Sequence, residues 1–206
     1  GIIGCGWAGS QAVQAAKVVP RTTVIAVADI QPNRCQPVAK EFSVPETYED
    51  CHSLFANSQI DAVYLATSPD GRLQMVLDAL EAGKHLLCEK PVDLNYEKVK
   101  IVSEIVETAG INFMLGFNRR FDPHIIQLKK AINNGEAGVP RIVKITSRDP
   151  QPPPIDFIKN SGGLFFDMSI HDFDMARYLV DDEVVQVTAN GKVFGDLDME
   201  KYDDID

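Results

Sequence analysis

The sequence lacks positive charge and has no basic cluster. Its 206 residues include 20 lysines and arginines against 30 aspartates and glutamates, which gives a formal net charge of −10. Nucleic acids and anionic membrane surfaces bind basic patches, so neither is an expected partner. The sequence also has no apolar run long enough to span a bilayer. These absences favour a soluble, cytoplasmic protein.

Cysteine is scarce, and its spacing forms no recognised pattern. Cys5, Cys35, Cys51 and Cys88 make no CxxC pair and lie in or beside segments predicted to form the core. Structural zinc sites and disulfide frameworks need a regular cysteine spacing. We therefore expect free thiols in a reducing compartment and no bound metal.

What the sequence does contain, at its start, is a glycine-rich turn. Gly4-x-Gly6-x-x-Gly9 follows an apolar run and precedes a helical pattern rich in alanine and valine. Gly4 would form a tight turn, Gly6 would let the backbone approach a pyrophosphate, and Gly9 would let the helix pack closely on a sheet. The helix N-terminus would then face the phosphates of a dinucleotide. By itself the motif fits an ordinary strand–turn–helix junction equally well.

A carboxylate in the expected place strengthens the dinucleotide interpretation. The apolar residues 24–28 end in Asp29, about twenty residues after Gly9. An acid at the tip of the second strand can accept hydrogen bonds from both adenosine ribose hydroxyls, and it would repel a 2′-phosphate. NAD is therefore favoured over NADP, although Arg34 is close enough to soften that preference. An ordinary strand-end acid is the simpler alternative for Asp29 alone.

Apolar strands and amphipathic helices alternate through the first 117 residues. Strands are predicted at 24–28, 62–66, 85–88 and 113–117, and helices at 10–19, 33–43, 50–56, 73–82 and 95–109. Pro37 predicts a kink or a late start in the second helix. Alternation of this kind is typical of an α/β fold with a parallel sheet covered on both faces. We therefore predict a Rossmann-type domain over 1–117.

The pattern changes after residue 117. Helices are predicted at 123–134 and 165–179, and strands at 141–147 and 184–194 with a turn near Asn190-Gly191. Four prolines should stiffen the loop 148–163 into a fixed active-site wall. We interpret 118–206 as an incomplete α+β domain for substrate binding and oligomerisation.

Glu89-Lys90-Pro91 ends a predicted parallel strand, the edge where open α/β sheets bind ligands. The Lys90 ammonium would point toward a bound nicotinamide, whereas a lone lysine is more often simply a surface residue. Pro91 could form a cis peptide bond with Lys90. Ala66 and Thr67 follow the central strand and could line the cofactor at the same edge.

Asp167-x-x-x-His171-x-x-Asp174 places three polar side chains on one helical face. His171 could exchange a proton near neutral pH, with Asp167 orienting it or holding a substrate hydroxyl. A half-buried histidine beside a helix acid is an equally good interpretation. A hard metal ion is a third, although no second cluster of histidine or cysteine supports it.

The segment 116–123 connects the two halves. Asn118 and Arg119 could reach the cofactor or the substrate from it, whereas Arg120 could be only part of a polar linker. Asp149 follows the strand predicted at 141–147. It is either a pocket acid or an ordinary turn acid.

Taken together, these motifs resemble the Gfo/Idh/MocA family of NAD(P)-dependent sugar and polyol oxidoreductases. The resemblance rests on the glycine turn, Asp29 and the segments 82–91, 116–123 and 161–177, and the segment 147–154 is most similar to inositol 2-dehydrogenases. It implies that Lys90 contacts the reacting hydroxyl and that His171 is the acid/base with Asp167 as its partner. It also implies hydride transfer from a secondary hydroxyl to NAD, with myo-inositol as the best candidate substrate.

The complete set of expected site residues is as follows. Cofactor residues are Gly4, Gly6, Trp7, Ala8, Gly9, Asp29, Arg34, Ala66, Thr67, Glu89, Lys90 and Asn118; substrate residues are Lys90, Arg119, Asp149, Asp167 and His171.

Two departures from the family pattern stand out. Members usually carry a histidine a few residues after the central strand, where this chain has Arg72. Members are also considerably longer, and their second domain has a large open, mostly antiparallel sheet. In addition, Gly1 stands only three residues before the glycine turn, which is short for a first strand. We therefore expect that this sequence is truncated at both ends. The resemblance also implies that a full-length protein forms a dimer or tetramer.

Two other functions fit the same residues. One is a non-catalytic NAD-binding sensor or truncated product. The other is an NADP-dependent sugar or dihydrodiol oxidoreductase of the same family, which Asp29 disfavours.

Overall fold

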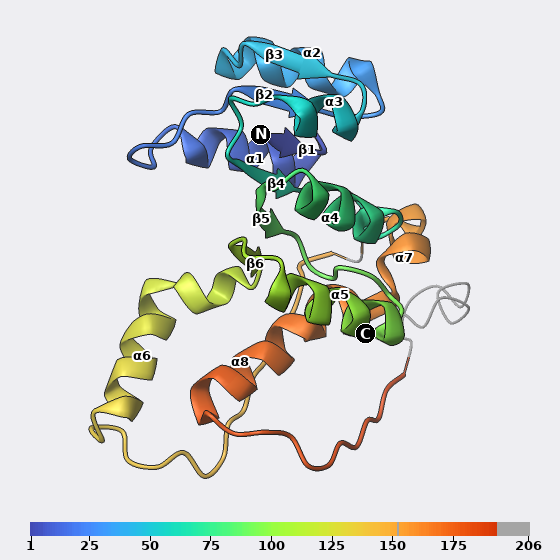
Figure 1. The fold of residues 1–206 in the computed structure, drawn as a ribbon. Helices are drawn as coiled ribbons and strands as arrows, with labels where there is room; N and C mark the ends of the chain where they lie inside the picture. The colour runs from blue at the N-terminus through green and yellow to red at the C-terminus, as the bar shows by residue number, and fades with distance from the viewer. Residues whose placement is uncertain (152, 193–206) are drawn as a thin grey trace. The chain divides into compact units, whose positions relative to one another are not determined.

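The computed structural model describes residues 1–151 and 153–192 of the chain (Figure 1). It divides into two compact units, Gly1–Gly116 and Phe117–Asp206, and each unit is described by itself. No helix in the described ranges combines the length and apolar character needed to cross a membrane.

The first unit is built on a six-stranded sheet whose order is β3-β2-β1-β4-β5-β6, and all neighbouring strands are parallel. The strands are β1 (Ile2–Ile3), β2 (Ala26–Ala28), β3 (Glu46–Tyr48), β4 (Ala62–Leu65), β5 (His85–Cys88) and β6 (Phe113–Leu115). The strand order reverses between β1 and β4. In open α/β sheets such a switch point is where ligands bind.

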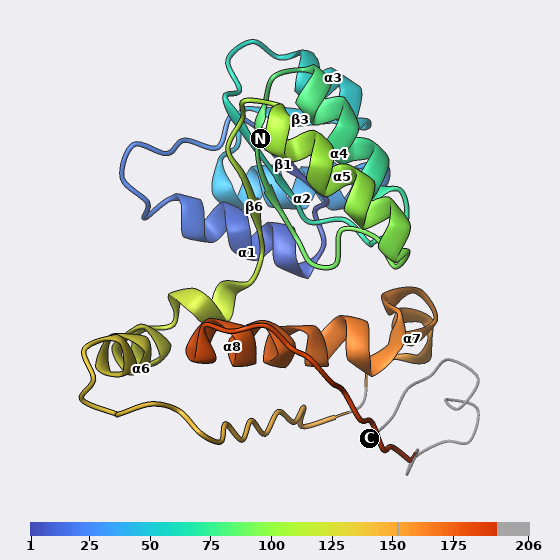
Figure 2. The same ribbon diagram turned by 60° about the horizontal axis from the view of Figure 1, so that its bottom comes forward.

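Helices cover both faces of this sheet, as Figure 2 shows. They are α1 (Trp7–Ala16), α2 (Pro32–Phe42), α3 (Cys51–Ala56), α4 (Arg72–Glu81) and α5 (Tyr96–Thr108). Helices α1 and α2 contribute Val13, Cys35 and Val38 to one buried cluster, whereas α3, α4 and α5 contribute to the other. The predicted Rossmann-type α/β fold is therefore confirmed.

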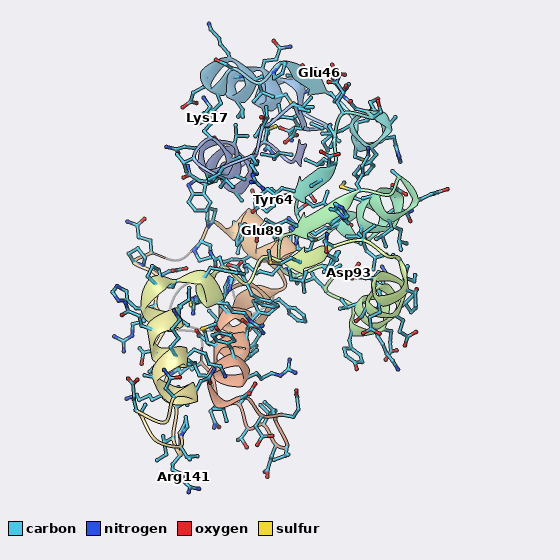
Figure 3. The ribbon with its side chains drawn as sticks, turned by 60° about the vertical axis from the view of Figure 1, so that its left-hand side comes forward. Lys17, Glu46, Tyr64, Glu89, Asp93 and Arg141 are labelled. Atoms are coloured by element: carbon cyan, nitrogen blue, oxygen red, sulfur yellow. The ribbon has the colours of Figure 1, made fainter. Side chains whose placement is uncertain are left out.

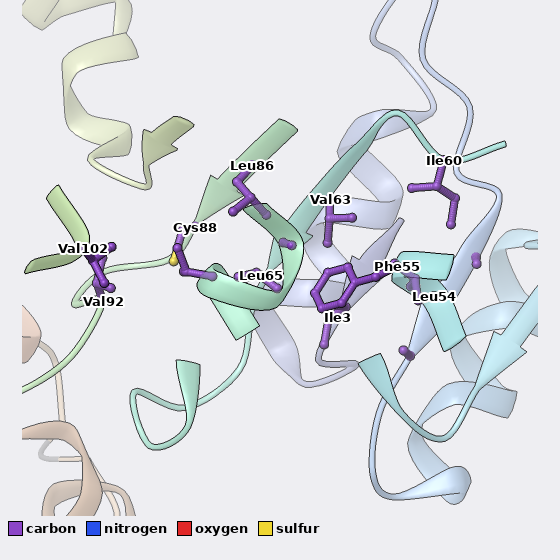
Figure 4. Packing of buried hydrophobic residues seen from close by; sticks show 14 residues of the cluster. Ile3, Leu54, Phe55, Ile60, Val63, Leu65, Leu86, Cys88, Val92 and Val102 are labelled. Carbon is purple, nitrogen blue, oxygen red and sulfur yellow. The ribbon is translucent and has the colours of Figure 1, made fainter. Parts of the chain in front are cut away.

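Strand β4 shows how alternating side chains divide between these two clusters. Val63 and Leu65 are buried in the cluster under α3, α4 and α5 (Figure 4), whereas Tyr64 packs against the cluster on the opposite face. Burying a valine or leucine side chain stabilises a fold by about 1.5–3 kcal/mol. The central strand therefore anchors both layers.

Several element boundaries differ from the sequence-based expectation. Helix α1 covers Trp7–Ala16 instead of 10–19, so it begins directly at the glycine turn. Helix α2 begins earlier than expected, at Pro32, and keeps Pro37 in its interior. Strand β3 was not predicted, because Glu46-Thr47-Tyr48 is short and lacks an apolar run.

The described part of the second unit is helical. It contains a 3₁₀ turn η1 (Asn118–Phe121), helices α6 (Pro123–Asn133) and α7 (Ile155–Ser161), a π-helical segment η2 (Phe165–Ser169) and helix α8 (Ile170–Val180). Helices α6 and α8 contact each other, and η1 contacts both.

Two expectations for this unit are wrong. Residues 141–147 and 184–192 form no strand, because the described part of the unit offers no neighbouring strand to share backbone hydrogen bonds. The loop 148–163 is not an extended proline wall throughout, since α7 forms within it from Ile155. Pro152 and residues 193 and 194 lie outside the described residues.

Replacing Gly9 by alanine should destabilise the first unit strongly. A Cβ at Gly9 would lie 1.8 Å from the Gly4 carbonyl oxygen, so helix α1 would have to move away from the turn. We expect a loss of about 1–3 kcal/mol in the free energy of unfolding, measured by urea denaturation. Gly6→Ala is the matched control, because a Cβ at Gly6 would meet no heavy atom within 4 Å. Equal losses in the two variants would contradict the prediction.

Candidate cofactor and catalytic site

Gly4 and Gly6 differ in how closely the rest of the protein packs against the glycine turn. Gly4 has φ of +94°, and its amide donates to the Ala28 carbonyl at 2.8 Å. A Cβ on Gly4 would lie 2.7 Å from the Ala66 carbonyl oxygen, so glycine is required there. Gly6 differs, because the space beside its Cα holds no heavy atom that a Cβ would meet within 4 Å. The turn is thus tight toward the protein and open on the Gly6 side.

Helix α1 begins immediately after this open side. Gly6 is its N-cap residue, and no side chain caps the helix. Trp7, the first helical residue, is 82% exposed, and Ala8 is half-buried. A helix N-terminus without a side-chain cap presents amide N–H groups and a partial positive charge, which together favour a bound phosphate.

Asp29 is buried at the end of β2, where it contacts the glycine turn. Its Oδ2 accepts from the Cys5 amide at 2.8 Å, and its Oδ1 accepts from the Gln31 amide at 2.9 Å. Because each carboxylate oxygen can accept a second hydrogen bond, these contacts leave capacity for two hydroxyls. Asp29 therefore holds the turn in place in addition to its expected role. Arg34 is exposed on α2, three residues after Gln31.

Four of the expected cofactor positions meet at one edge of the sheet. Gly4 follows β1, Asp29 follows β2, Ala66 follows β4, and Lys90 comes two residues after β5. All these strands are parallel, so their carboxyl ends lie along the same edge. Backbone hydrogen bonds continue across this edge, for example from the Ala66 amide to the Ile3 carbonyl at 2.8 Å. The structure therefore brings these four expected positions to one edge of the sheet.

Glu89 has a different environment from the one expected of a cofactor ligand. Tyr64 donates its phenol hydrogen to Glu89 Oε1, and the two side chains lie next to each other in Figure 3. Glu89 Oε2 accepts from the Lys90 amide at 3.3 Å. Burial and this contact with Glu89 raise the pKa of Tyr64, which stays neutral. Glu89 thus helps to fix the segment that carries Lys90, whose peptide bond to Pro91 is cis.

In the second unit, Asp167 and His171 lie in two different kinds of helix. Asp167 belongs to the π-helical segment η2, whereas His171 is in the first turn of α8. Both are half-buried, and the His171 ring meets the Phe117 ring edge-on with centroids 6.2 Å apart. A π-helical segment turns less per residue than an α-helix and often marks a functional site. The expectation that Asp167 and His171 share one face of a single α-helix is therefore wrong, because Asp167 lies in the π-helical segment.

Asp174, the third member of that motif, has a separate role. It is buried and binds Arg120 through both carboxylate oxygens, with Nε to Oδ2 at 2.8 Å. Arg120 also lies over the Tyr178 ring at 5.1 Å. Arg120 therefore forms an ion pair with Asp174 and is not only part of a linker.

Arg119 takes part in a second pair that the sequence did not reveal. Its Nη1 donates to Asp172 and, at 3.2 Å, to the Ser147 hydroxyl, which itself donates to Asp172 at 2.7 Å. The consecutive residues Arg119 and Arg120 bind Asp172 and Asp174, which lie two residues apart. This matched spacing was the signal in the sequence that could have revealed the two ion pairs. Asn118 is exposed in η1 beside this pair.

A cavity of about 400 Å³ lies next to Arg119 within the second unit. Its walls are Arg119, Ile125, Ile145, Thr146, Ser147, Arg148, Asp149, Met168, Met175 and Leu179. It therefore contains two of the expected substrate residues, Arg119 and Asp149, together with Met168 from the segment that carries Asp167.

One group of possible metal ligands occurs among the described residues. Ligand atoms of Cys51, His52 and Asp78 lie within 4.8 Å of one another. Neither Asp167 nor His171 belongs to this group.

Comparison with known proteins agrees with this geometry. Residues 1–117 match the model of the oxidoreductase family with an NAD-binding Rossmann fold, and residues 125–205 match the GFO/IDH/MocA C-terminal domain. Myo-inositol 2-dehydrogenase of Thermotoga maritima is 39% identical over the whole chain.

Solved structures show the same likeness. A probable dehydrogenase from Thermotoga maritima has a TM-score of 0.95 at 39% identity over 100% of the chain. Scyllo-inositol dehydrogenase from Lactobacillus casei, with bound NAD(H) and scyllo-inositol, has a TM-score of 0.81 at 29% identity over 99% of the chain. The chain spans 62% of the length of each of these three relatives. With a family model matched over more than half of its length, the chain belongs to the Gfo/Idh/MocA oxidoreductases with an NAD-binding Rossmann fold.

Proposed function

We propose that the protein is an NAD-dependent dehydrogenase that oxidises a secondary hydroxyl of inositol or a related cyclic polyol. The observation that carries this proposal is the sheet edge of the first unit, where the open side of Gly6, the Asp29 carboxylate and Lys90 follow parallel strands. Relatives named inositol dehydrogenases support the choice of substrate.

The residues of this edge fit NAD. Gly6 and the N-terminus of α1 would hold the pyrophosphate, Asp29 would accept the ribose hydroxyls, and Ala66 and Thr67 would line the path toward the nicotinamide. When bound, NAD supplies the acceptor for the hydride. We assign residues 1–117 to cofactor binding and residues 118–206 to substrate binding and self-association in a homo-oligomer.

Three side chains of the chain would handle the substrate hydroxyl. Lys90 would donate a hydrogen bond to the hydroxyl oxygen and stabilise the negative charge that develops there. His171 would take the hydroxyl proton as general base, because its pKa range suits proton exchange near neutral pH. Asp167 would orient the substrate or the imidazole. Arg119 and Asp149 would contact other hydroxyls of the ring.

The direct test uses the full-length protein with NAD and with NADP. We expect NAD to bind more tightly, and absorbance at the reduced-nicotinamide band to rise with myo-inositol or scyllo-inositol but less with glucose. Gly6→Ala should bind NAD at least about tenfold more weakly, since its methyl group would occupy the pyrophosphate side. NAD binding without absorbance change for any polyol would instead indicate a non-catalytic sensor.

Lys90→Met should remove catalysis more than binding. We expect kcat/KM for the polyol to fall by about 10²–10⁴, because the developing alkoxide loses its cationic hydrogen-bond donor. The Kd for NAD, measured by fluorescence titration, should change far less. Lys98→Met is the control, because Lys98 is an exposed lysine of α5. Full activity in Lys90→Met would contradict the catalytic assignment.

Asp29→Ser should weaken the preference for NAD over NADP. The substitution removes a negative charge that would face the 2′-phosphate, and it leaves a hydroxyl that can still bond to the turn. We expect the ratio of NADP Kd to NAD Kd to fall by about tenfold, which corresponds to about 1.4 kcal/mol. An unchanged ratio would show that Asp29 acts only on the turn.

A further inference from the structure

Arg72, the first residue of α4, is a buried cation beside the segment that carries Lys90. Its side chain and backbone together are 3% exposed. Its Nη1 donates to the Glu89 carbonyl at 2.8 Å and to the Pro91 carbonyl, and its Nη2 donates to the Thr67 carbonyl. One guanidinium thus binds three main-chain oxygens from the loops after β4 and β5.

Two of these oxygens lie on either side of Lys90 in the chain. The Glu89 carbonyl belongs to the peptide bond before Lys90, and the Pro91 carbonyl lies just beyond the peptide bond that follows it. Glu89 is held a second time through its side chain, by Tyr64. The main chain around Lys90 is therefore fixed from the α4 side and from the opposite face of the sheet.

The contacts of Arg72 make it costly for this segment to move. Burial lowers the pKa of the guanidinium, although the nearby Glu89 carboxylate favours its charge. A buried charge is tolerated only when its hydrogen-bond donors have partners. The Nε of Arg72 has no partner among the described residues, so only Nη1 and Nη2 are hydrogen-bonded. The three carbonyl contacts must therefore compensate for desolvation, and losing any of them would leave a poorly solvated charge.

From this geometry we infer that Arg72 is a positioning residue for Lys90: by holding the carbonyls on both sides of Lys90, it sets where the Lys90 ammonium stands relative to the reacting hydroxyl. The inference rests on the proposed catalytic function of Lys90. It assigns to Arg72 no contact with substrate or cofactor.

The opposite end of the same strands offers a matched comparison. Lys84 precedes β5, is 8% exposed, and donates to the Asn57 and Ile60 carbonyls at 2.9 and 2.8 Å. It is likewise a buried cation that holds loop carbonyls in the first unit. Because it lies at the amino end of β4 and β5, its loss should weaken the fold without disturbing the Lys90 segment directly.

The experiment is a double-mutant cycle in the full-length protein, with kcat for polyol oxidation as the readout. Arg72→Met should lower kcat by about 10–100-fold in the parent protein, since small misplacement of a catalytic group is expensive. In the Lys90→Met background the same change should lower kcat by less than about threefold, because the group being positioned is absent. The kcat of Arg72→Lys should lie between those of the parent protein and Arg72→Met, since an ammonium lacks the planar fork with which a guanidinium binds several carbonyls.

Lys84→Met provides the control for a purely structural effect. It should reduce stability to urea comparably to Arg72→Met but leave kcat within about threefold of the parent, with equal effects in both backgrounds. Hydrogen exchange of the peptide covering 86–92 should accelerate in Arg72→Met and not in Lys84→Met. This readout does not depend on activity.

The possible results distinguish a failure of the positioning role of Arg72 from a failure of the proposed dehydrogenase function. Additive effects of Arg72→Met and Lys90→Met in an active protein, or unchanged exchange over 86–92, would overturn the positioning role alone. An inactive parent protein would overturn the proposed function and, with it, this inference.

Discussion

The close packing of α1 on the turn after β1 is the constraint on which the cofactor edge depends. Gly9 approaches the Gly4 carbonyl so closely that a Cβ would lie 1.8 Å from it. This approach keeps the N-terminus of α1 at the sheet edge and leaves the Cys5 amide directed at Asp29. An outward shift of α1 would therefore move its N-terminus away from the sheet edge and also disturb the contact between the Cys5 amide and Asp29. The geometry that stabilises the fold is thus also the geometry that would bind a dinucleotide.

Side-chain to main-chain hydrogen bonds fix the loops along this edge. Asp29 accepts from two amides, whereas Arg72 donates to three carbonyls, so each buried charge faces main-chain groups of opposite partial charge. Loops at a binding edge need such support, because they lack the regular hydrogen bonds of strands and helices. Cys88, at the end of β5, remains a neutral thiol, since burial raises its pKa to about 12. Arg72 and Asp29 are therefore the two buried charges that bind the main chain along this edge.

Sequence reasoning succeeded where local patterns determine structure. Apolar runs and the glycine turn were sufficient to predict the parallel sheet and the edge that carries Asp29 and Lys90. It failed where partners far along the chain decide the outcome, as for residues 141–147, since a strand exists only beside another strand. The π-helical segment around Asp167 and the burial of Arg72 were likewise invisible, because neither has a signature in residue spacing.

The pairing of charges in the second unit bears on which substrate its cavity suits. Arg119 is bound to Asp172, and Arg148 lies in the same wall as Asp149, so the positive and negative charges around the cavity balance. A phosphorylated or carboxylated sugar would need an excess of positive charge there. A neutral polyol needs only donors and acceptors, and Arg119 engages Ser147 and Asp172 through Nη1, which leaves its Nε and Nη2 hydrogens to meet hydroxyl oxygens. Paired charges of this kind are compatible with the neutral polyol that we propose as substrate.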